Sequence, residues 1–291
     1  MDKQSELAIV RRAYAKQVLA TAGVKEPRLE SAYAEVSREY FLGPGPWPIF
    51  RWWSGTYTQS PNDDPVHLYT NDVIGIDPER RINNGEPALH ANLIAAALPG
   101  QGEHVVHIGT GVGYYTAILA HLVGSSGRVT GIEFESDLAA RAKVNFSASP
   151  NVEIIQGDGM VIGFDTANVI YVNAGASQPA KTWLEGLAEG GRLILPLTTE
   201  HGFTAARSSE QVARSGAVFR IERRGTDYLA KSISSVAIFP CAGGRDPIAE
   251  AALSAAFAAG GLQDVTRLYR HNAIPAERCW LRSTDWCLAC S

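Results

Sequence analysis

Hydrophobic and polar positions alternate along the chain with two different periods, and the change from one to the other divides the sequence. Apolar residues at helical spacing predict a helix over 5–20 and a second one over 27–40. The stretch 43–66 is rich in Pro, Gly and Trp, and it is not expected to form a regular helix because proline interrupts the backbone hydrogen bonds. A further helix is expected at 88–98.

From residue 104 onward, short apolar runs alternate with helical segments. Strands are expected at 105–108, 128–132, 152–155, 169–172 and 192–196, and helices at 115–122, 137–146 and 179–187. This alternation predicts an α/β fold, a Rossmann-like parallel sheet with helices on both faces. Later strands are expected at 203–208, 217–223 and 233–239, followed by a helix at 248–259.

Composition and charge exclude several classes of protein. The 291 residues are 45% hydrophobic and 19% charged, which is typical of globular domains, and the net charge of −4 argues against a nucleic-acid-binding protein. No apolar run approaches the roughly 18 residues that span a bilayer. The N-terminus lacks the apolar core of a signal peptide. We therefore expect a cytoplasmic protein without a membrane or nucleic-acid partner.

The four cysteines, Cys241, Cys279, Cys287 and Cys290, all lie late in the chain. A chain of this length can bury a core without disulfides, so reduced thiols are expected. Cys287 and Cys290 form a C-x-x-C pair, but no neighbouring Cys or His completes a zinc-ligand set. No metal site is predicted.

A glycine-rich turn follows the run at 105–108: Gly109-Thr110-Gly111-Val112-Gly113. Glycines allow a tight turn and a close approach to a ligand, and the next helix presents free N–H groups. A dinucleotide fingerprint needs a third glycine at 114 or 116, where Tyr and Thr stand instead. The G-x-G-x-G spacing is typical of S-adenosylmethionine-dependent methyltransferases, and a tight packing turn is the alternative.

Acidic residues follow the next two strands. Glu133 ends the second strand, where a carboxylate can bind both ribose hydroxyls. Gly157-Asp158-Gly159 closes the third strand, where the carboxylate could accept a hydrogen bond from an adenine amino group. Ligands bind at the carboxyl ends of such strands, so the three features together indicate a nucleoside-containing cofactor.

These residues resemble the protein-L-isoaspartate O-methyltransferase family. The similar segments are 99–120, 129–146, 151–160 and 189–197, together with 18–41, which resembles the family's N-terminal helices, and 219–240, which resembles its later hairpin. The resemblance implies S-adenosyl-L-methionine as cofactor and the carboxylate of an isoaspartyl residue in a peptide or protein as acceptor. It also implies that Gly109, Gly111 and Gly113 line the methionine end, that Glu133 holds the ribose, and that Asp158, in the segment 157–159, holds the adenine. The other predicted cofactor contacts are His107, Thr110, Gly157, Gly159 and Asn173.

Three domains are expected on this basis. Residues 1–98 would form N-terminal helices and a substrate-side cap, 99–240 the methyltransferase core, and 241–291 a C-terminal extension packed on the core. Trp47, Trp52 and Trp53 could roof a peptide-binding cleft or pack a loop or subunit interface.

The departures from the family concern its substrate motif. If Pro87 and Ala91 are aligned with the family's T-I-S-x-P motif, Gly85 takes the place of its serine. His107 stands where the family has an acidic residue before the first glycine, and Val236 begins a segment that lacks the family's arginine. The cofactor half is thus retained while the substrate half differs.

The chemistry tolerates these changes. A carboxylate with a pKa of about 4 is ionised at neutral pH and needs no general base, so Asn83 or Asn84 could orient it. A hydroxyl acceptor would need a base, for which His90 is a candidate. Asn173 could contact cofactor or acceptor, or cap the next helix. The alternatives are a methyltransferase for another peptide or small metabolite, and a non-catalytic binding module.

Overall fold

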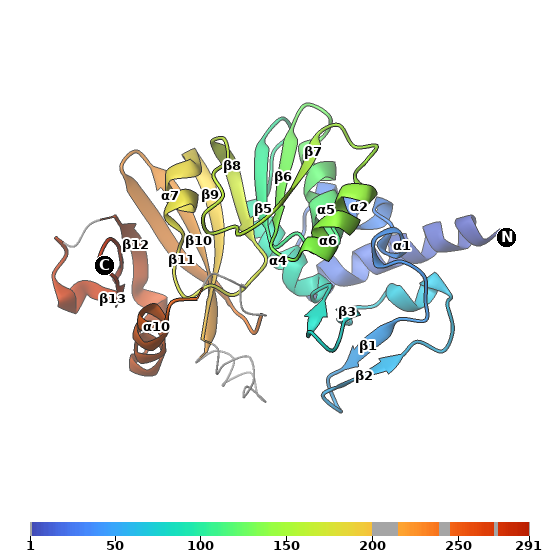
Figure 1. Cartoon of the computed structure of the whole chain (residues 1–291), viewed down its shortest axis with the longest axis horizontal. Coiled ribbons are helices and arrows are strands. Elements are labelled where there is room, and N and C mark those ends of the chain that lie inside the picture. The colour runs from blue at the N-terminus through green and yellow to red at the C-terminus, as the bar shows by residue number, and fades with distance from the viewer. Residues whose placement is uncertain (1, 200–214, 239–244, 271–272, 291) are drawn as a thin grey trace.

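The computed structural model describes residues 2–199, 215–238, 245–270 and 273–290. Within them, one sheet of ten strands runs along the longest axis of the molecule in the order β13-β14-β12-β11-β10-β9-β8-β5-β6-β7 (Figure 1). Its strands are β5 (His104–Ile108), β6 (Arg128–Glu133), β7 (Val152–Gln156), β8 (Ala167–Val172), β9 (Leu187–Thr198), β10 (Gly216–Arg224), β11 (Asp227–Ser235), β12 (Val265–Tyr269), β13 (Cys279–Arg282) and β14 (Cys287–Cys290). Two hairpins, β1 (Pro48–Arg51) with β2 (Thr56–Gln59) and β3 (Gly75–Asp77) with β4 (Ile82–Asn83), stand apart from it.

The sheet is parallel in one half and antiparallel in the other. β5 pairs in parallel with β6 and β8, and the parallel part continues to β7 and β9. From β9 onward each neighbour is antiparallel, through β10, β11, β12, β14 and β13. The predicted α/β fold with a parallel sheet is therefore confirmed, and the C-terminal strands extend that same sheet.

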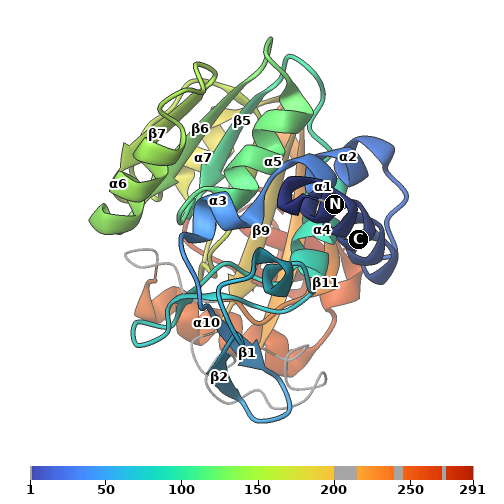
Figure 2. The same ribbon diagram turned by 90° about the vertical axis from the view of Figure 1, so that its right-hand side faces the viewer.

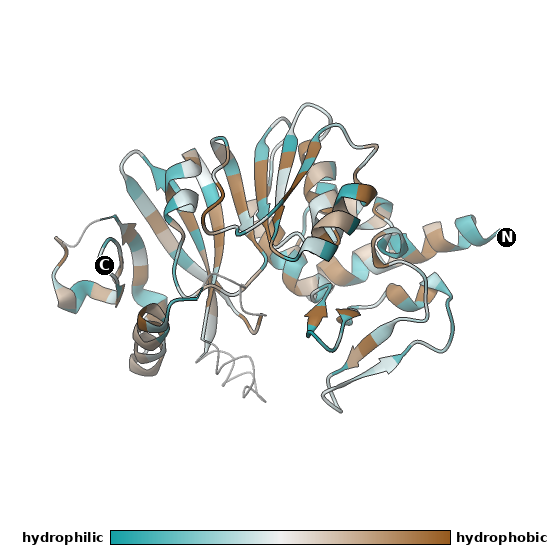
Figure 3. Ribbon diagram, in the orientation of Figure 1, coloured by the Kyte–Doolittle hydropathy of each residue, from teal (hydrophilic) through white to brown (hydrophobic). Residues whose placement is uncertain are grey.

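The helices cover both faces of the sheet. They are α1 (Lys3–Thr21), α2 (Pro27–Glu35), α3 (Arg38–Leu42), α4 (Pro87–Ala97), α5 (Tyr114–Val123), α6 (Ser136–Asn145), α7 (Lys181–Gly186) and α10 (Pro247–Ala259). Val105 belongs to a core shared with α1, α2, α4 and α5, whereas Val106 belongs to a core shared with α7 and α10. Because successive strand residues point to opposite faces, the continuous apolar runs of the central strands supply both cores (Figure 3).

Several expected elements have different bounds. The helix predicted over 27–40 is interrupted at Val36, whose backbone is extended, so α2 and α3 are separate. The strand expected at 233–239 starts at Asp227, because a turn at Gly225 pairs it with β10. The strand expected at 203–208 lies outside the described residues. No helix in the described part of the chain is both long and apolar enough to cross a membrane.

The expectation that the late cysteines are reduced thiols is wrong for two of them. Cys279 and Cys287 form a disulfide, with Cα atoms 6.0 Å apart. The antiparallel pairing of β13 and β14 brings the two residues within the separation that a disulfide requires. Cys290 is a free thiol, and Cys241 lies outside the described residues.

Arg192 of β9 fixes the C-terminal end of α4. Its guanidinium donates to the carbonyl oxygens of Ala97 and Leu98, each at 2.9 Å, and to both carboxylate oxygens of Glu103 at 2.8 Å. The last carbonyls of a helix have no partner inside it, so this arginine satisfies them from the sheet. α4 thereby gains a defined position against the sheet.

Replacing Arg192 by Ala should lower the free energy of unfolding by about 2–3 kcal/mol, because several charge-assisted hydrogen bonds are lost together. Chemical denaturation measures the change. Arg128→Ala is a suitable control, since its bond to Asp165 is exposed and should contribute less than about 1 kcal/mol. Equal effects of the two substitutions would contradict the assignment.

Candidate active site

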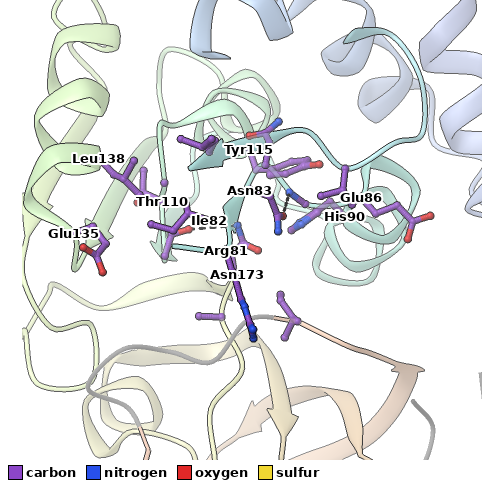
Figure 4. Close-up of a pocket in the computed structure, with 18 of the residues that line it drawn as sticks. Arg81, Ile82, Asn83, Glu86, His90, Thr110, Tyr115, Glu135, Leu138 and Asn173 are labelled. Atoms are coloured by element: carbon purple, nitrogen blue, oxygen red, sulfur yellow. Dashed lines mark hydrogen bonds between the residues drawn. The ribbon is translucent and has the colours of Figure 1, made fainter. Parts of the chain in front are cut away.

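A cleft of about 690 Å³ lies at the carboxyl ends of β5, β6 and β8. One wall is the glycine turn and the end of β6, and the other is formed by residues 83–86, α4 and the two hairpins. Figure 4 shows Asn83, His90 and Tyr115 on one side of this space and Thr110 and Leu138 on the other. In the view of Figure 2, the β1–β2 hairpin projects from the region below α4.

The three glycines of the turn have different roles. Gly109 has φ +77° and a Cβ there would lie 3.1 Å from the carbonyl oxygen of Asn173, so the turn must pass close to β8. Gly111 has φ +58°, lines the cleft, and a Cβ would meet no atom within 4 Å. Gly113 begins α5, and a Cβ there would lie 2.5 Å from the ring of Phe146. Gly109 and Gly111 thus border the cleft, while Gly113 is a packing position.

Glu133 presents a buried carboxylate to the cleft. One oxygen accepts from the N–H of Gly111 at 2.6 Å and the other from the N–H of Glu135 at 3.0 Å. The side chain is 6% exposed, and burial raises its pKa although these two hydrogen bonds act against the shift. Each carboxylate oxygen can accept a further hydrogen bond, so the site fits a ribose with two hydroxyl donors.

Phe134 is a cleft residue that the sequence pattern did not single out. It directly follows Glu133, lines the cleft and is 45% exposed. A large aromatic face beside a buried acidic residue suits a flat nucleobase next to its ribose. Its position immediately after the acidic residue is the signal that could have identified it.

The three residues of the segment 157–159, which is predicted to hold the adenine, have different surroundings in the structure. Gly159 lines the cleft, and a Cβ there would lie 2.5 Å from Ile108, so close packing requires glycine. The carboxylate of Asp158 accepts from the N–H of Met160 at 2.8 Å and borders a different cavity of about 1320 Å³. Gly157 packs against Ile162. The adenine contact of Asp158 stays a prediction.

His107 does not reach the cleft, which corrects the expectation that it contacts the cofactor. Its side chain is fully buried, and Nδ1 lies 2.8 Å from the hydroxyl of Thr116 on α5. Burial lowers the pKa of His107 to about 3, so the imidazole is neutral. The reason is strand alternation, because residue 107 points to a packed face of the sheet rather than beyond the strand end.

Thr110 and Asn173 both line the cleft and also hold its backbone. The Thr110 hydroxyl donates to the carbonyl of His107 at 3.3 Å, and the Asn173 amide donates to the carbonyl of Gly109 at 3.3 Å. Asn173 does not cap the next helix, because α7 begins at Lys181 with Ala180 as its N-cap. Their expected contacts with a cofactor remain predictions.

Asn83 and Asn84 differ in what their side chains can still bind. The Asn83 oxygen accepts from the N–H of Gly85 at 2.8 Å, and its side chain also bonds the hydroxyl of Tyr57. Asn84 is 7% exposed and lines the cleft, and its Nδ2 has no hydrogen-bond partner among the described residues. A buried donor without a partner is costly, so this amide is a strong candidate to bind a ligand oxygen.

His90 and Gly85 are in direct contact. A Cβ on Gly85, which has φ +69°, would lie 2.2 Å from Nε2 of His90. The imidazole cannot move away easily, because it stacks on Tyr115 at 3.8 Å and its Nδ1 is 2.6 Å from the hydroxyl of Tyr171. A side chain at residue 85 and the observed His90 ring therefore exclude each other.

A Rossmann-like sheet whose cleft combines a glycine turn of G-x-G-x-G spacing with a buried acidic residue on the next strand is typical of S-adenosylmethionine-dependent methyltransferases. The family described as Protein-L-isoaspartate(D-aspartate) O-methyltransferase matches residues 57–226. A protein-L-isoaspartate O-methyltransferase of Methanoregula boonei is 30% identical over 73% of this chain and 88% of its own length. The chain belongs to this family of S-adenosylmethionine-dependent enzymes.

One of the other relatives matches over a smaller share of its own length. The protein-L-isoaspartate O-methyltransferase of Thermotoga maritima is 29% identical over 62% of this chain, and the match spans only 53% of that relative. Among solved structures, one protein-L-isoaspartate O-methyltransferase has a TM-score of 0.63 at 23% identity, covering 79% of this chain and 65% of the other. A Plasmodium falciparum structure has a TM-score of 0.59 at 15% identity, covering 79% and 97%. These two likenesses support the fold.

The contact between residues 85 and 90 yields a prediction about stability. Gly85→Ala should lower the free energy of unfolding by about 2 kcal/mol or more, because a left-handed backbone and a collision with His90 are imposed together. Gly85→Ala combined with His90→Ala should lose less than the sum of the two single changes, by about 1 kcal/mol. Denaturant titration of the four proteins measures this coupling, and simple additivity would contradict the contact.

Proposed function

We propose that the protein is a carboxyl O-methyltransferase that uses S-adenosyl-L-methionine to methylate a carboxylate on a peptide or protein. The acceptor named by the family description, an isoaspartyl residue, is the first candidate. The observation that carries the proposal is Asn84, a buried cleft residue whose amide N–H has no partner among the described residues. A neutral donor of this kind orients a carboxylate oxygen without neutralising its charge.

The cofactor would supply a methyl group on a positively charged sulfur. Glu133 would accept hydrogen bonds from the ribose, Phe134 would cover the base, and the open face of Gly111 would leave room for the methionine part. The turn and the end of β6 are held together by the Gly111–Glu133 hydrogen bond, so these groups are positioned before a ligand binds.

The residues on the other wall would orient the acceptor and exclude water. An ionised carboxylate is already a nucleophile, so the protein must align it rather than remove a proton. Asn84 would donate to one carboxylate oxygen. His90 and Tyr115, stacked and buried, would form an aromatic floor that keeps solvent from the reacting oxygen.

His90 is poorly suited to act as a general base for a hydroxyl acceptor. Burial lowers its pKa to about 3, so the imidazole would hold an abstracted proton only weakly at neutral pH. Its Nδ1 is also occupied by Tyr171. Both facts favour a carboxylate over an alcohol or phenol as the acceptor.

We propose further that the pair Gly85 and His90 replaces the serine of the family's substrate motif. With glycine at 85, the imidazole occupies the volume that a serine side chain would take. The orienting hydrogen bond then comes from Asn84, the preceding residue. This arrangement supports a family member whose acceptor contacts are supplied by different side chains.

Methyl transfer from labelled S-adenosylmethionine to an isoaspartyl peptide tests the function, with the normal aspartyl peptide as control. We expect selective labelling of the isoaspartyl peptide. No transfer to this peptide, together with demonstrated cofactor binding, would contradict the isoaspartyl assignment. Transfer to a different peptide or small molecule would then identify another acceptor, and no transfer to any would favour a binding module.

Asn84→Asp should reduce kcat/KM for the acceptor by about 10- to 100-fold, because a carboxylate replaces the N–H donor and repels the acceptor. Binding of S-adenosylhomocysteine, measured by calorimetry, should stay unchanged. Asn62→Asp is a matched control, since the side-chain oxygen of Asn62 bonds the N–H of Asp64 and Nε2 of His67, and the residue does not line the cleft. Unaltered kinetics in Asn84→Asp would refute the role of Asn84.

A further inference from the structure

The mouth of the cleft is built by the two hairpins, which pack together. The N–H of Phe50 donates to the carbonyl of Val73 at 2.9 Å, and Ile49 forms an isolated bridge with Ile74. A Cβ on Gly75 would lie 3.0 Å from the ring of Tyr57, so the β3 backbone is pressed against the first hairpin. Side chains carried by the two hairpins are therefore held in fixed relation to each other.

Trp52 extends an aromatic wall from the cleft to the surface. It lies in the turn between β1 and β2, lines the cleft and is 64% exposed. Its ring meets that of Phe50 edge-on at 4.9 Å, and Phe50 in turn meets Tyr57 at 5.2 Å. All three rings line the same cleft, so they offer one continuous apolar surface to a ligand at its mouth.

The next residue, Trp53, differs from Trp52 in its surroundings. Trp53 is 81% exposed and is absent from the cleft lining, and the guanidinium of Arg51 lies over its ring at 5.5 Å. Two adjacent tryptophans in one turn thus separate into one that faces the cleft and one that does not. The pair provides a variant and its matched control.

Arg81 places a positive charge at the mouth of the cleft, and its own backbone is strained. It lies just before β4, lines the cleft, and has φ +59°, a left-handed conformation that glycine or asparagine adopts more easily. Strained residues are retained where function requires the side chain. Since a glycine would fit this turn with less strain, the presence of arginine points to a role for the side chain.

The two neighbouring arginines have different partners. Arg80 lies within ion-pair distance of Asp77, Glu135 and Asp137. Among the described residues, no side chain or carbonyl forms an ion pair or a hydrogen bond with the guanidinium of Arg81. The charge of Arg81 is thus available to an anionic ligand, and an apolar wall beside it strengthens such an interaction.

We propose that the mouth of the cleft binds an acidic acceptor peptide, with Arg81 paired to a flanking carboxylate and Trp52 packed on a neighbouring apolar side chain. This inference rests on the proposed function. The flanking carboxylate differs from the reacting one, because a guanidinium on the reacting group would draw charge from the nucleophilic oxygen. Arg81 and Asn84 are three residues apart on either side of β4, so their Cα atoms are at most about 10 Å apart. Neighbouring side chains of an extended peptide span such a distance.

The test uses two isoaspartyl peptides that differ only in a flanking Glu or Gln. Calorimetric titration in the presence of S-adenosylhomocysteine should show at least about 10-fold tighter binding of the Glu peptide. Arg81→Gly should abolish this preference while raising the Tm, because the left-handed strain is relieved. Arg81→Lys keeps the charge and should retain part of the preference.

Variants of Trp52 and Trp53 test the proposed apolar contact between Trp52 and the peptide. Trp52→Ala should weaken binding of both peptides by about 10-fold, whereas Trp53→Ala should leave binding unchanged. Equal effects of the two tryptophan variants, or equal binding of the Glu and Gln peptides by the wild type, would overturn the proposal. Weaker binding of S-adenosylhomocysteine by Arg81→Gly would also overturn it, since Arg81 would then belong to the cofactor site.

These readouts are separate from methyl transfer. A wild type that prefers the Glu peptide but transfers no methyl group would refute the proposed function and leave this peptide site standing. A wild type that methylates both peptides without preference would refute the peptide site alone. Absence of binding to either peptide would refute the peptide site directly.

Discussion

The cleft depends on the reversal of strand order at β5, where β6 lies on one side and β8 on the other. The chain runs from β5 to β6 and β7 on one side of β5 and then crosses to β8 on the other side, so the turn after β5 is flanked by the ends of β6 and β8. The N–H of Gly109 bonds Ile132 at 2.9 Å, and the N–H of Asn173 bonds Ile108 at 2.8 Å. These two bonds hold the three strand ends in register, and ligands of open α/β sheets bind at such a reversal of strand order.

Around this point the two walls of the cleft are built on different principles. The wall that we propose to bind the cofactor relies on backbone close to its neighbours and on one buried carboxylate, Glu133, which the turn itself hydrogen-bonds. The wall that we propose to bind the acceptor relies on aromatic packing and neutral amides. His90 illustrates the second principle, because a ring fixed by Tyr115 and Tyr171 fills the space beside Gly85. An ionised acceptor needs positioning more than proton transfer, and such a wall suits that need.

The antiparallel half of the sheet extends the molecule on the side away from the cleft. β12, β13 and β14 continue the sheet beyond β11, and the Cys279–Cys287 disulfide joins two of these strands. Figure 1 places them at the opposite end of the longest axis from the N-terminus. The added strands share one core with α7 and α10, so the extension is part of the same packed structure as the catalytic sheet.

The sequence alone determined the elements of the parallel sheet, its glycine turn and the acidic residue of the next strand, because periodicity and short motifs are local properties. It indicated the family through the same segments. The tertiary structure decided what depends on contacts between distant residues. It buried His107 against Thr116, joined two cysteines across a hairpin, and set His90 against Gly85. It also left the buried Asn84 amide without a partner among the described residues and placed Arg81 in the lining of the cleft. No local pattern encodes whether a side chain finds a partner, because that partner lies elsewhere in the chain and only packing brings the two together.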